Sequence, residues 1–79
     1  MNIKILGTGC TRCHELAKNT REVIKELSID ATIEEISDIN KIISYHVMIT
    51  PGLVINEKVV ISGKVPTRKE ITQFIKNSQ

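Results

Sequence analysis

The stretch GTGCTRCHEL, Gly7 to Leu16, constrains this chain more than any other part of it. It contains both cysteines of the protein, Cys10 and Cys13, separated by two residues. A short apolar run, NIKIL, precedes it, and a stretch with helical periodicity follows it. The glycines of the intervening loop tolerate unusual backbone angles. This order predicts a strand, a tight loop and a cysteine pair at the beginning of a helix.

The expected helix gives the two thiols different reactivities. A cysteine has an ordinary pKa of roughly 8.5, and the thiolate is its reactive form. If the helix begins at or just after Cys10, its unpaired N–H groups and dipole stabilise the Cys10 thiolate. Cys13 lies one turn later on the inner side, so it is more shielded. We therefore expect Cys10 to attack and Cys13 to resolve.

A proton acceptor for Cys13 is harder to find in the sequence. Lys4 is the only charged residue in the first expected strand. No obvious buried acid therefore stands close to the cysteine pair along the chain.

Length and composition limit the other possibilities. With 79 residues the chain is expected to form one small domain, 1–79, and such domains bury only roughly 60% of their unfolded surface. A Cys10–Cys13 disulfide would close too short a loop to stabilise the fold appreciably. The cysteine pair is therefore expected to serve chemistry.

The charge distribution and the N-terminal sequence indicate the expected partners and the expected cellular compartment of the protein. The 11 Lys and Arg residues against 9 Asp and Glu give a net charge of +2, and both signs are scattered, so nucleic-acid binding is not supported. No apolar stretch is long enough for a signal peptide or a membrane span. We therefore expect a cytoplasmic protein, where a close cysteine pair is more often catalytic or metal-binding than structural.

Hydrophobic periodicity and turn residues predict seven elements. They are a strand over Asn2–Leu6, a helix over Thr11–Ser28, a strand over Asp30–Ile36, a short helix capped by Ser37 or Asp38 and running to Tyr45, a hairpin of Leu53–Ile55 and Val59–Ile61, and a last helix opened by Pro66 to Glu70. The short helix is expected to bury Ile39, Ile42 and Ile43. Thr67 and Glu70 are spaced as a capping box.

This order predicts an α/β fold. Two strands joined by a long helix should pair in parallel, whereas the final two strands form an antiparallel hairpin. The simplest compact arrangement is a four-stranded mixed sheet flanked by helices.

The element order, the CTRCH motif and the stretch VMITPGLVINEKVVISGKVP resemble the thioredoxin and glutaredoxin superfamily. The closest likeness is to its minimal prokaryotic thioredoxin-like members, the redox-active disulfide proteins, and it covers essentially the whole chain. The resemblance implies a minimal thioredoxin fold with Cys10 as nucleophile and Cys13 as resolving thiol. It also implies a cis peptide bond at Pro51, which would turn the Thr50 backbone toward an extended substrate.

The chain departs from this pattern between and before its cysteines. Thioredoxin has Trp before the first cysteine and Gly-Pro between the two, whereas this chain has Gly9, then Thr11 and Arg12. Thr11 and Arg12 are assigned to substrate binding together with Thr50 and Pro51. Arg12 could also stabilise the Cys10 thiolate, or be only solvated.

The activity implied by the resemblance is thiol–disulfide exchange. We expect a disulfide-containing substrate protein, an external dithiol reductase and a monomeric protein that binds neither nucleic acid nor membranes. No cofactor and no metal site are expected in the domain itself.

Three alternatives use the same residues. CTRCH matches the c-type haem attachment motif, with Met48 as a conceivable axial ligand, but haem attachment normally requires export. Cys10 and Cys13 could bind Cu(I) or Zn as in small ferredoxin-like metallochaperones, although those domains lack a Thr-Pro pair before a closing hairpin. A redox-regulated interaction module with weak turnover is the third.

Overall fold

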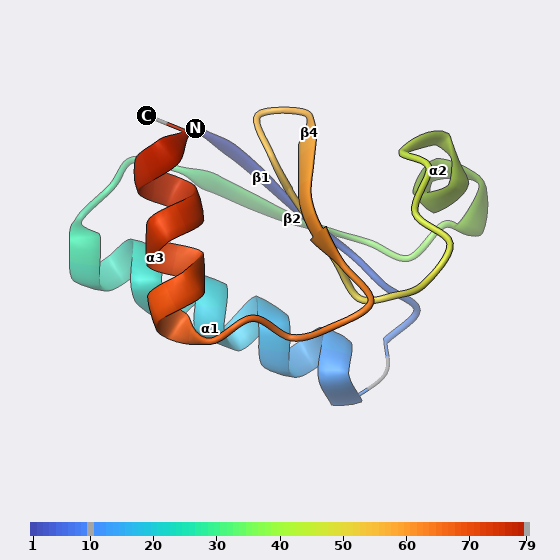
Figure 1. Ribbon diagram of the computed structural model, residues 1–79, viewed down its shortest axis with the longest axis horizontal. Coiled ribbons are helices and arrows are strands. Elements are labelled where there is room, and N and C mark those ends of the chain that lie inside the picture. Colours follow the sequence, from blue (N-terminus) through green and yellow to red (C-terminus); the bar gives the residue numbers. More distant parts are fainter. Residues whose placement is uncertain (10, 79) are drawn as a thin grey trace.

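A four-stranded mixed sheet forms the centre of the fold, with helices on both faces (Figure 1). The computed structural model describes residues 1–9 and 11–78. In chain order the elements are β1 (Asn2–Leu6), α1 (Thr11–Leu27), β2 (Thr32–Ile36), α2 (Ile39–Ser44), β3 (Gly52–Ile55), β4 (Lys58–Ser62) and α3 (Arg68–Asn77). The expected α/β class and minimal thioredoxin fold are confirmed.

Strand β1 occupies an inner position in the sheet, whose order is β2-β1-β3-β4. It pairs in parallel with β2 and antiparallel with β3, and β3 pairs antiparallel with β4. The register places Leu6, the last residue of β1, opposite Gly52, the first residue of β3. The loop after β1 and the loop before β3 therefore lie at the same end of the sheet.

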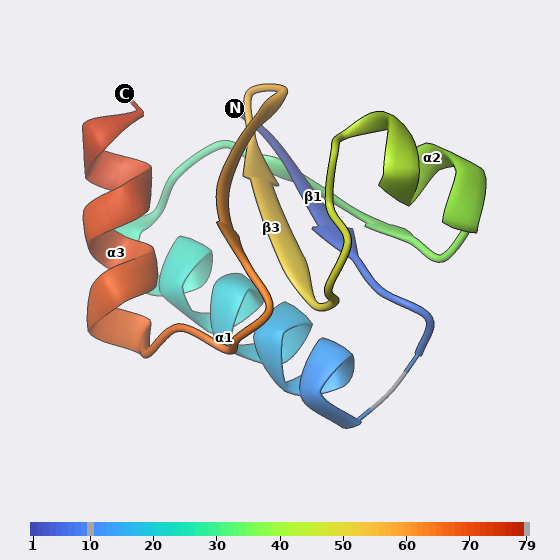
Figure 2. The same ribbon diagram turned by 45° about the vertical axis from the view of Figure 1, so that its right-hand side comes forward.

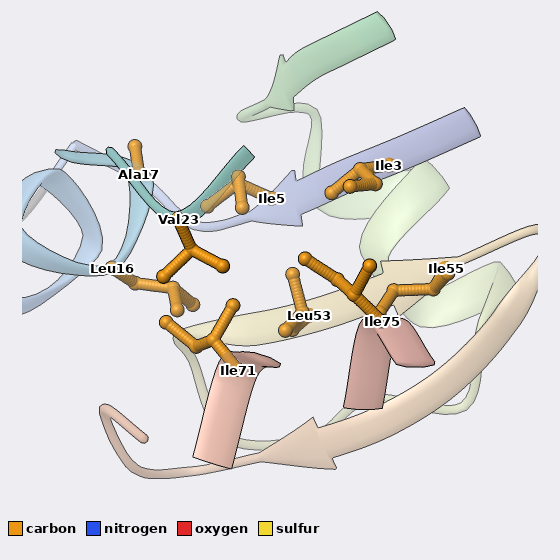
Figure 3. Packing of buried hydrophobic residues seen from close by; sticks show 9 residues of the cluster. All are labelled: Ile3, Ile5, Leu16, Ala17, Val23, Leu53, Ile55, Ile71 and Ile75. Carbon is orange, nitrogen blue, oxygen red and sulfur yellow. The ribbon is translucent and has the colours of Figure 1, made fainter. Parts of the chain in front are cut away.

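The two faces of the sheet carry separate apolar clusters. Helices α1 and α3 cover one face and α2 covers the other (Figures 1 and 2). The larger cluster lies under α1 and α3 (Figure 3) and consists of Ile3, Ile5, Leu16, Ala17, Val23, Leu53, Ile55, Ile71 and Ile75. The smaller cluster lies under α2 and consists of Leu6, Ile36, Ile42, Val47 and Val54. Alternation along β1 sends Ile3 and Ile5 to one cluster and Leu6 to the other.

Several expected boundaries shift. Helix α2 ends at Ser44 rather than Tyr45, and the hairpin strands are each longer than expected, at Gly52–Ile55 and Lys58–Ser62. Helix α1 ends at Leu27 rather than Ser28, because Ser28 has a φ of 52° and leaves the helical conformation. Strand β2 begins at Thr32 rather than Asp30, because the parallel register opens with Thr32 opposite Asn2, where β1 itself begins.

The expected buried side of α2 is wrong for two of its three isoleucines. Ile42 is buried, but Ile39 and Ile43 are 60% and 53% exposed. A helix of six residues contacts the sheet along one narrow face, so only Ile42 reaches the smaller cluster.

A hairpin turn and a helix cap are each formed by residues close together in the sequence. Asn56 and Glu57 connect β3 and β4 and have φ values of 51° and 67°; two central residues with positive φ are typical of a type I′ hairpin turn. The capping box of α3 is confirmed: the backbone N–H of Glu70 donates to Thr67 Oγ1, and that of Thr67 donates to Glu70 Oε1.

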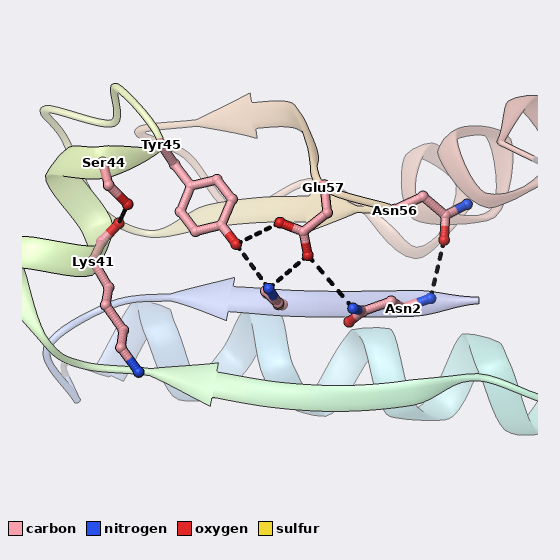
Figure 4. Close-up of polar contacts among 7 residues, drawn as sticks. Asn2, Lys41, Ser44, Tyr45, Asn56 and Glu57 are labelled. Carbon is pink, nitrogen blue, oxygen red and sulfur yellow. Dashed lines mark hydrogen bonds and ion pairs between the residues drawn. The ribbon is translucent and has the colours of Figure 1, made fainter.

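A charged cluster joins β1, α2 and the hairpin turn on the α2 face (Figure 4). Lys4 Nζ donates to Glu57 Oε1 at 2.6 Å and to the Tyr45 hydroxyl at 2.8 Å. The Tyr45 hydroxyl donates to Glu57 Oε2 at 2.8 Å. Lys4 is thus held by partners on the face of the sheet opposite α1.

These contacts shift two pKa values in opposite directions. The hydrogen bonds from Lys4 and then Tyr45 lower the pKa of Glu57 below its ordinary value of 4.5. The hydrogen bonds to Glu57 and then Tyr45 raise the pKa of Lys4 above its ordinary value of 10.5. The Glu57 contribution to stability is therefore complete above pH 4.5 and is lost as the pH falls through its lowered pKa. The Lys4 contribution is complete below pH 10.5 and is lost as the pH rises through its raised pKa.

Glu57→Gln should make stability less sensitive to acid. The wild-type unfolding temperature should fall more steeply than that of the variant between about pH 5 and about pH 3, because only the wild type must protonate Glu57. Thermal unfolding followed by circular dichroism measures both slopes. The variant should keep a residual slope, since the pKa of Glu70 is also lowered, mainly by the hydrogen bond from the Thr67 backbone. Glu15→Gln, on the exposed face of α1, is the control; equal slopes for wild type and Glu57→Gln would contradict the prediction.

Candidate functional site

The cysteine pair lies in sequence at the junction of the β1 loop and α1. Helix α1 begins at Thr11, immediately after Cys10 in the chain. Cys10 itself lies outside the described residues, so its role as nucleophile stays a prediction. Cys13 is on the inner face of α1 and is 4% exposed, which agrees with the expected shielding of the second thiol. Thr11 and Arg12 are exposed at the helix start.

Cys13 packs directly on the backbone of the loop after β1. A methyl group at Gly7 would overlap the Cys13 Sγ atom and lie 2.8 Å from its Cβ atom. The Gly7 N–H donates to the Ile36 carbonyl at 2.9 Å, which holds this loop beside β2. The absence of a side chain at Gly7 is therefore what allows the thiol to approach the end of β1.

The Thr50–Pro51 peptide bond is cis, as the resemblance implied. Pro51 is fully buried and Thr50 is half-buried. Gly52, which follows, begins β3.

Gly63 connects the start of α1 with the proline loop. Arg12 Nη2 donates to the Gly63 carbonyl at 3.1 Å, and the Gly63 N–H donates to the Pro51 carbonyl at 2.9 Å. Gly63 has a φ of +82° and lies against Ile49, so a side chain there would be both strained and crowded. Arg12 therefore has a protein partner that sequence reasoning missed.

A hollow of about 250 Å³ opens beside Cys13. It is lined by Ile5, Gly7, Gly9, Cys13, Glu35 and Ser37. The Glu35 carboxylate also accepts a hydrogen bond from Arg21 of α1, with 2.9 Å between Nη2 and Oε2. The sequence showed no obvious buried acid near Cys13, and Glu35 comes from β2, more than twenty residues later in the chain.

An apolar groove of about 280 Å³ lies on the α2 side, between the loop after β1 and the proline loop. It is lined by Thr8, Ile39, Ile42, Ile43, Val47, Met48 and Thr50. Met48 is 86% exposed, and Ile49 beside it is 65% exposed. Four large apolar side chains, those of Ile39, Ile43, Met48 and Ile49, are thus presented to solvent close to Thr50.

Residues 1–9 and 11–78, which the structure describes, contain neither a metal-binding cluster of side chains nor a membrane-spanning helix. No group of three or more His, Cys, Asp or Glu side chains in them is placed to hold a metal ion. Their helices are all too short or too polar to cross a bilayer.

Comparisons with known proteins agree on one family. The family model for the thioredoxin domain matches residues 1–76, a range that includes both cysteines and Thr50–Pro51. The chain is 37% identical over 75 residues to a thioredoxin of Methanocaldococcus jannaschii, covering 95% of this chain and 86% of that protein. It is 40% identical over 75 residues to a thioredoxin of Methanothermobacter thermautotrophicus, covering 95% and 97%.

Gly7→Ala should destabilise the protein by about 1–3 kcal/mol, the usual cost of overpacking a buried site. The added methyl would overlap Cys13, which cannot move without displacing α1. Chemical denaturation measures the change. Gly52→Ala is the control, because a methyl there would lie 3.4 Å from Val47, an ordinary contact distance. Similar losses for the two variants would show that Cys13 does not pack on Gly7.

Proposed function

The chain belongs to the thioredoxin domain family, and we propose that it is a thiol–disulfide oxidoreductase whose Cys10 and Cys13 cycle between a dithiol and a disulfide. The observation that carries this proposal is the bridge through Gly63. That residue links Arg12, in the first turn of α1, to Pro51, which supports a site in which the start of the helix borders the Thr50–Pro51 loop.

The proposed reaction has two exchange steps. The Cys10 thiolate attacks one sulfur of a substrate disulfide, forming a mixed disulfide and releasing the other substrate sulfur as a thiolate. The Cys13 thiolate then attacks the Cys10 sulfur, forming the Cys10–Cys13 disulfide and releasing the second substrate thiolate. The substrate gains two electrons, and both of its thiolates take up protons. An external dithiol reductase restores the reduced protein, and no cofactor within the domain is needed.

Substrate binding is assigned to the residues around the two loops. Thr50 would pair its backbone with an extended substrate segment, as a strand adds to the edge of a sheet. Thr11 and Arg12 would border the same segment from the start of α1. The neighbouring apolar groove could receive a side chain of that segment, which favours protein disulfides over small ones. We place this activity in the cytoplasm, where it would help to keep protein thiols reduced, with the chain acting as a monomer.

Cys10→Ser should reduce insulin-reduction activity to the level of dithiothreitol alone, because the attacking thiol is lost. Cys13→Ser should instead accumulate a mixed disulfide with the substrate, since nothing resolves it. Turbidity measures the first result, and mass spectrometry before and after added reductant measures the second. Wild-type turnover by Cys10→Ser would falsify the mechanism. A stoichiometric metal in wild-type protein purified under reducing conditions would favour the soft-metal chaperone instead.

Ile43→Ser and Met48→Ser should each lower kcat/KM for a protein disulfide by about 3- to 10-fold, the effect of losing part of an apolar contact. Turnover of a small aromatic disulfide should be unchanged, because such a substrate does not extend into the groove. Steady-state kinetics with both substrates measures the difference. Lys76→Ser, on the exposed side of α3, is the matched control. Equal losses with both substrates would show that the groove does not bind protein.

A further inference from the structure

We propose that Glu35 accepts the proton of the Cys13 thiol, through water in the hollow that both residues line, when Cys13 attacks the mixed disulfide on Cys10. The inference rests on the proposed function, because it concerns the second of the two exchange steps.

Cys13 needs a proton acceptor because only a thiolate attacks a disulfide. At 4% exposure its side chain has little direct contact with bulk solvent. Lys4 cannot serve, since it carries a positive charge and is bound to Glu57 and Tyr45 on the other face of the sheet. Strand β1 therefore supplies no acceptor for Cys13.

The register of the sheet brings Glu35 to the correct face. Glu35 lies beside Ile5 in the parallel β1–β2 pairing, and laterally paired residues project to the same side of a sheet. Ile5 belongs to the cluster under α1, the helix that carries Cys13. Glu34, the preceding residue, is paired with Lys4 and projects to the opposite face.

The hollow can hold the water that the proposed transfer requires. Its volume of about 250 Å³ exceeds the roughly 30 Å³ that one water molecule occupies in the liquid. A proton can pass between a side chain and its acceptor through one water molecule. Ser37 also lines the hollow, and a serine hydroxyl can hydrogen-bond water.

The described lining of the hollow supplies one carboxylate. Among its described lining residues, Cys13 and Glu35 are the ones with titratable side chains. Arg21 of α1 contacts the Glu35 carboxylate, and β1 contributes the apolar Ile5 and the backbone of Gly7. With side-chain exposure of 46%, Glu35 also reaches solvent, to which it can pass the proton on.

Atoms and electrons balance in this step. The Cys13 proton moves through water to the Glu35 carboxylate, and the Cys13 thiolate forms a bond with the Cys10 sulfur. The bond between Cys10 and the substrate sulfur breaks, and its electron pair leaves with the substrate thiolate. Glu35 then returns the proton through water to that thiolate or to solvent.

A two-burst experiment separates this inference from the proposed function. Reduced protein is mixed with a symmetrical aromatic disulfide whose released thiolate is coloured, and absorbance is followed by stopped flow. Attack by Cys10 releases one equivalent of the coloured thiolate, which is the first burst of absorbance. Attack by Cys13 on the mixed disulfide releases a second equivalent, which is the second burst. The Cys13→Ser variant shows which burst belongs to which cysteine, because it should lose only the second burst.

Glu35→Gln should leave the first burst unchanged and slow the second about tenfold near pH 7. The difference should disappear above about pH 9, where hydroxide deprotonates an ordinary thiol without help. Glu34→Gln is the matched control and should behave as wild type. Arg21→Gln, which breaks the ion pair but keeps the carboxylate, should stay within about twofold of wild type, and Glu35→Asp should recover part of the rate.

Three results would overturn the inference. The second burst of Glu35→Gln could match wild type near pH 7, or it could be slowed equally at every pH, which would indicate a displaced Cys13 rather than a lost acceptor. Arg21→Gln could be as slow as Glu35→Gln, which would assign the effect to the ion pair. Absence of the first burst from the wild type would instead refute the proposed function, and the inference with it.

Discussion

Strand β1 is hydrogen-bonded along both edges, and this double pairing determines where the functional loops lie. Its parallel partner β2 brings Glu35 and Ser37 to the end of the strand, and its antiparallel partner β3 brings the proline loop to the same end. The loop leaving β1 must then turn back into α1 beneath these segments. The close approach of Cys13 to Gly7 is a consequence of that turn.

Strand β1 also contains a charged residue, Lys4, in the middle of the sheet. Lys4 is tolerated there because Glu57 and Tyr45 supply charged and polar partners on the α2 face. Alternation along β1 keeps this cluster on the opposite side of the sheet from Cys13. The sheet therefore separates the Lys4 cluster from the thiol, whereas the Glu35–Arg21 ion pair joins β2 to α1 on the thiol's side.

Local sequence signals predicted most of the fold. The amphipathic stripe of α1, the capping box of α3 and the strand before the cysteine motif all depend on residues a few positions apart, so they can be read directly from the chain. The cis bond at Pro51 came from the family resemblance, which supplied knowledge that no local pattern contains. The exposure of Ile39 and Ile43 could not be predicted from the sequence. Three isoleucines at helical spacing do not reveal how much of the sheet a six-residue helix can cover.

The features of the site that the sequence left hidden all depend on pairing between distant segments. Strand β2 contains two consecutive acids, and only its register with β1 shows that Glu35, rather than Glu34, lies on the α1 face of the sheet. Likewise, the contact of Arg12 with Gly63 joins residues 51 positions apart, and neither residue type signals the other. Cys10 lies outside the described residues, so its place in this arrangement stays a prediction.

The sheet divides the apolar interior into two clusters, and the two can change separately during evolution. Stability depends mainly on the cluster enclosed by α1 and α3, whereas the surface beside the proline loop is built on the smaller cluster under α2. Residues of α2 and its following loop can therefore diversify while the larger cluster keeps its packing. The exposed surface beside the proline loop and the packing of the larger cluster can consequently evolve at different rates within one short chain.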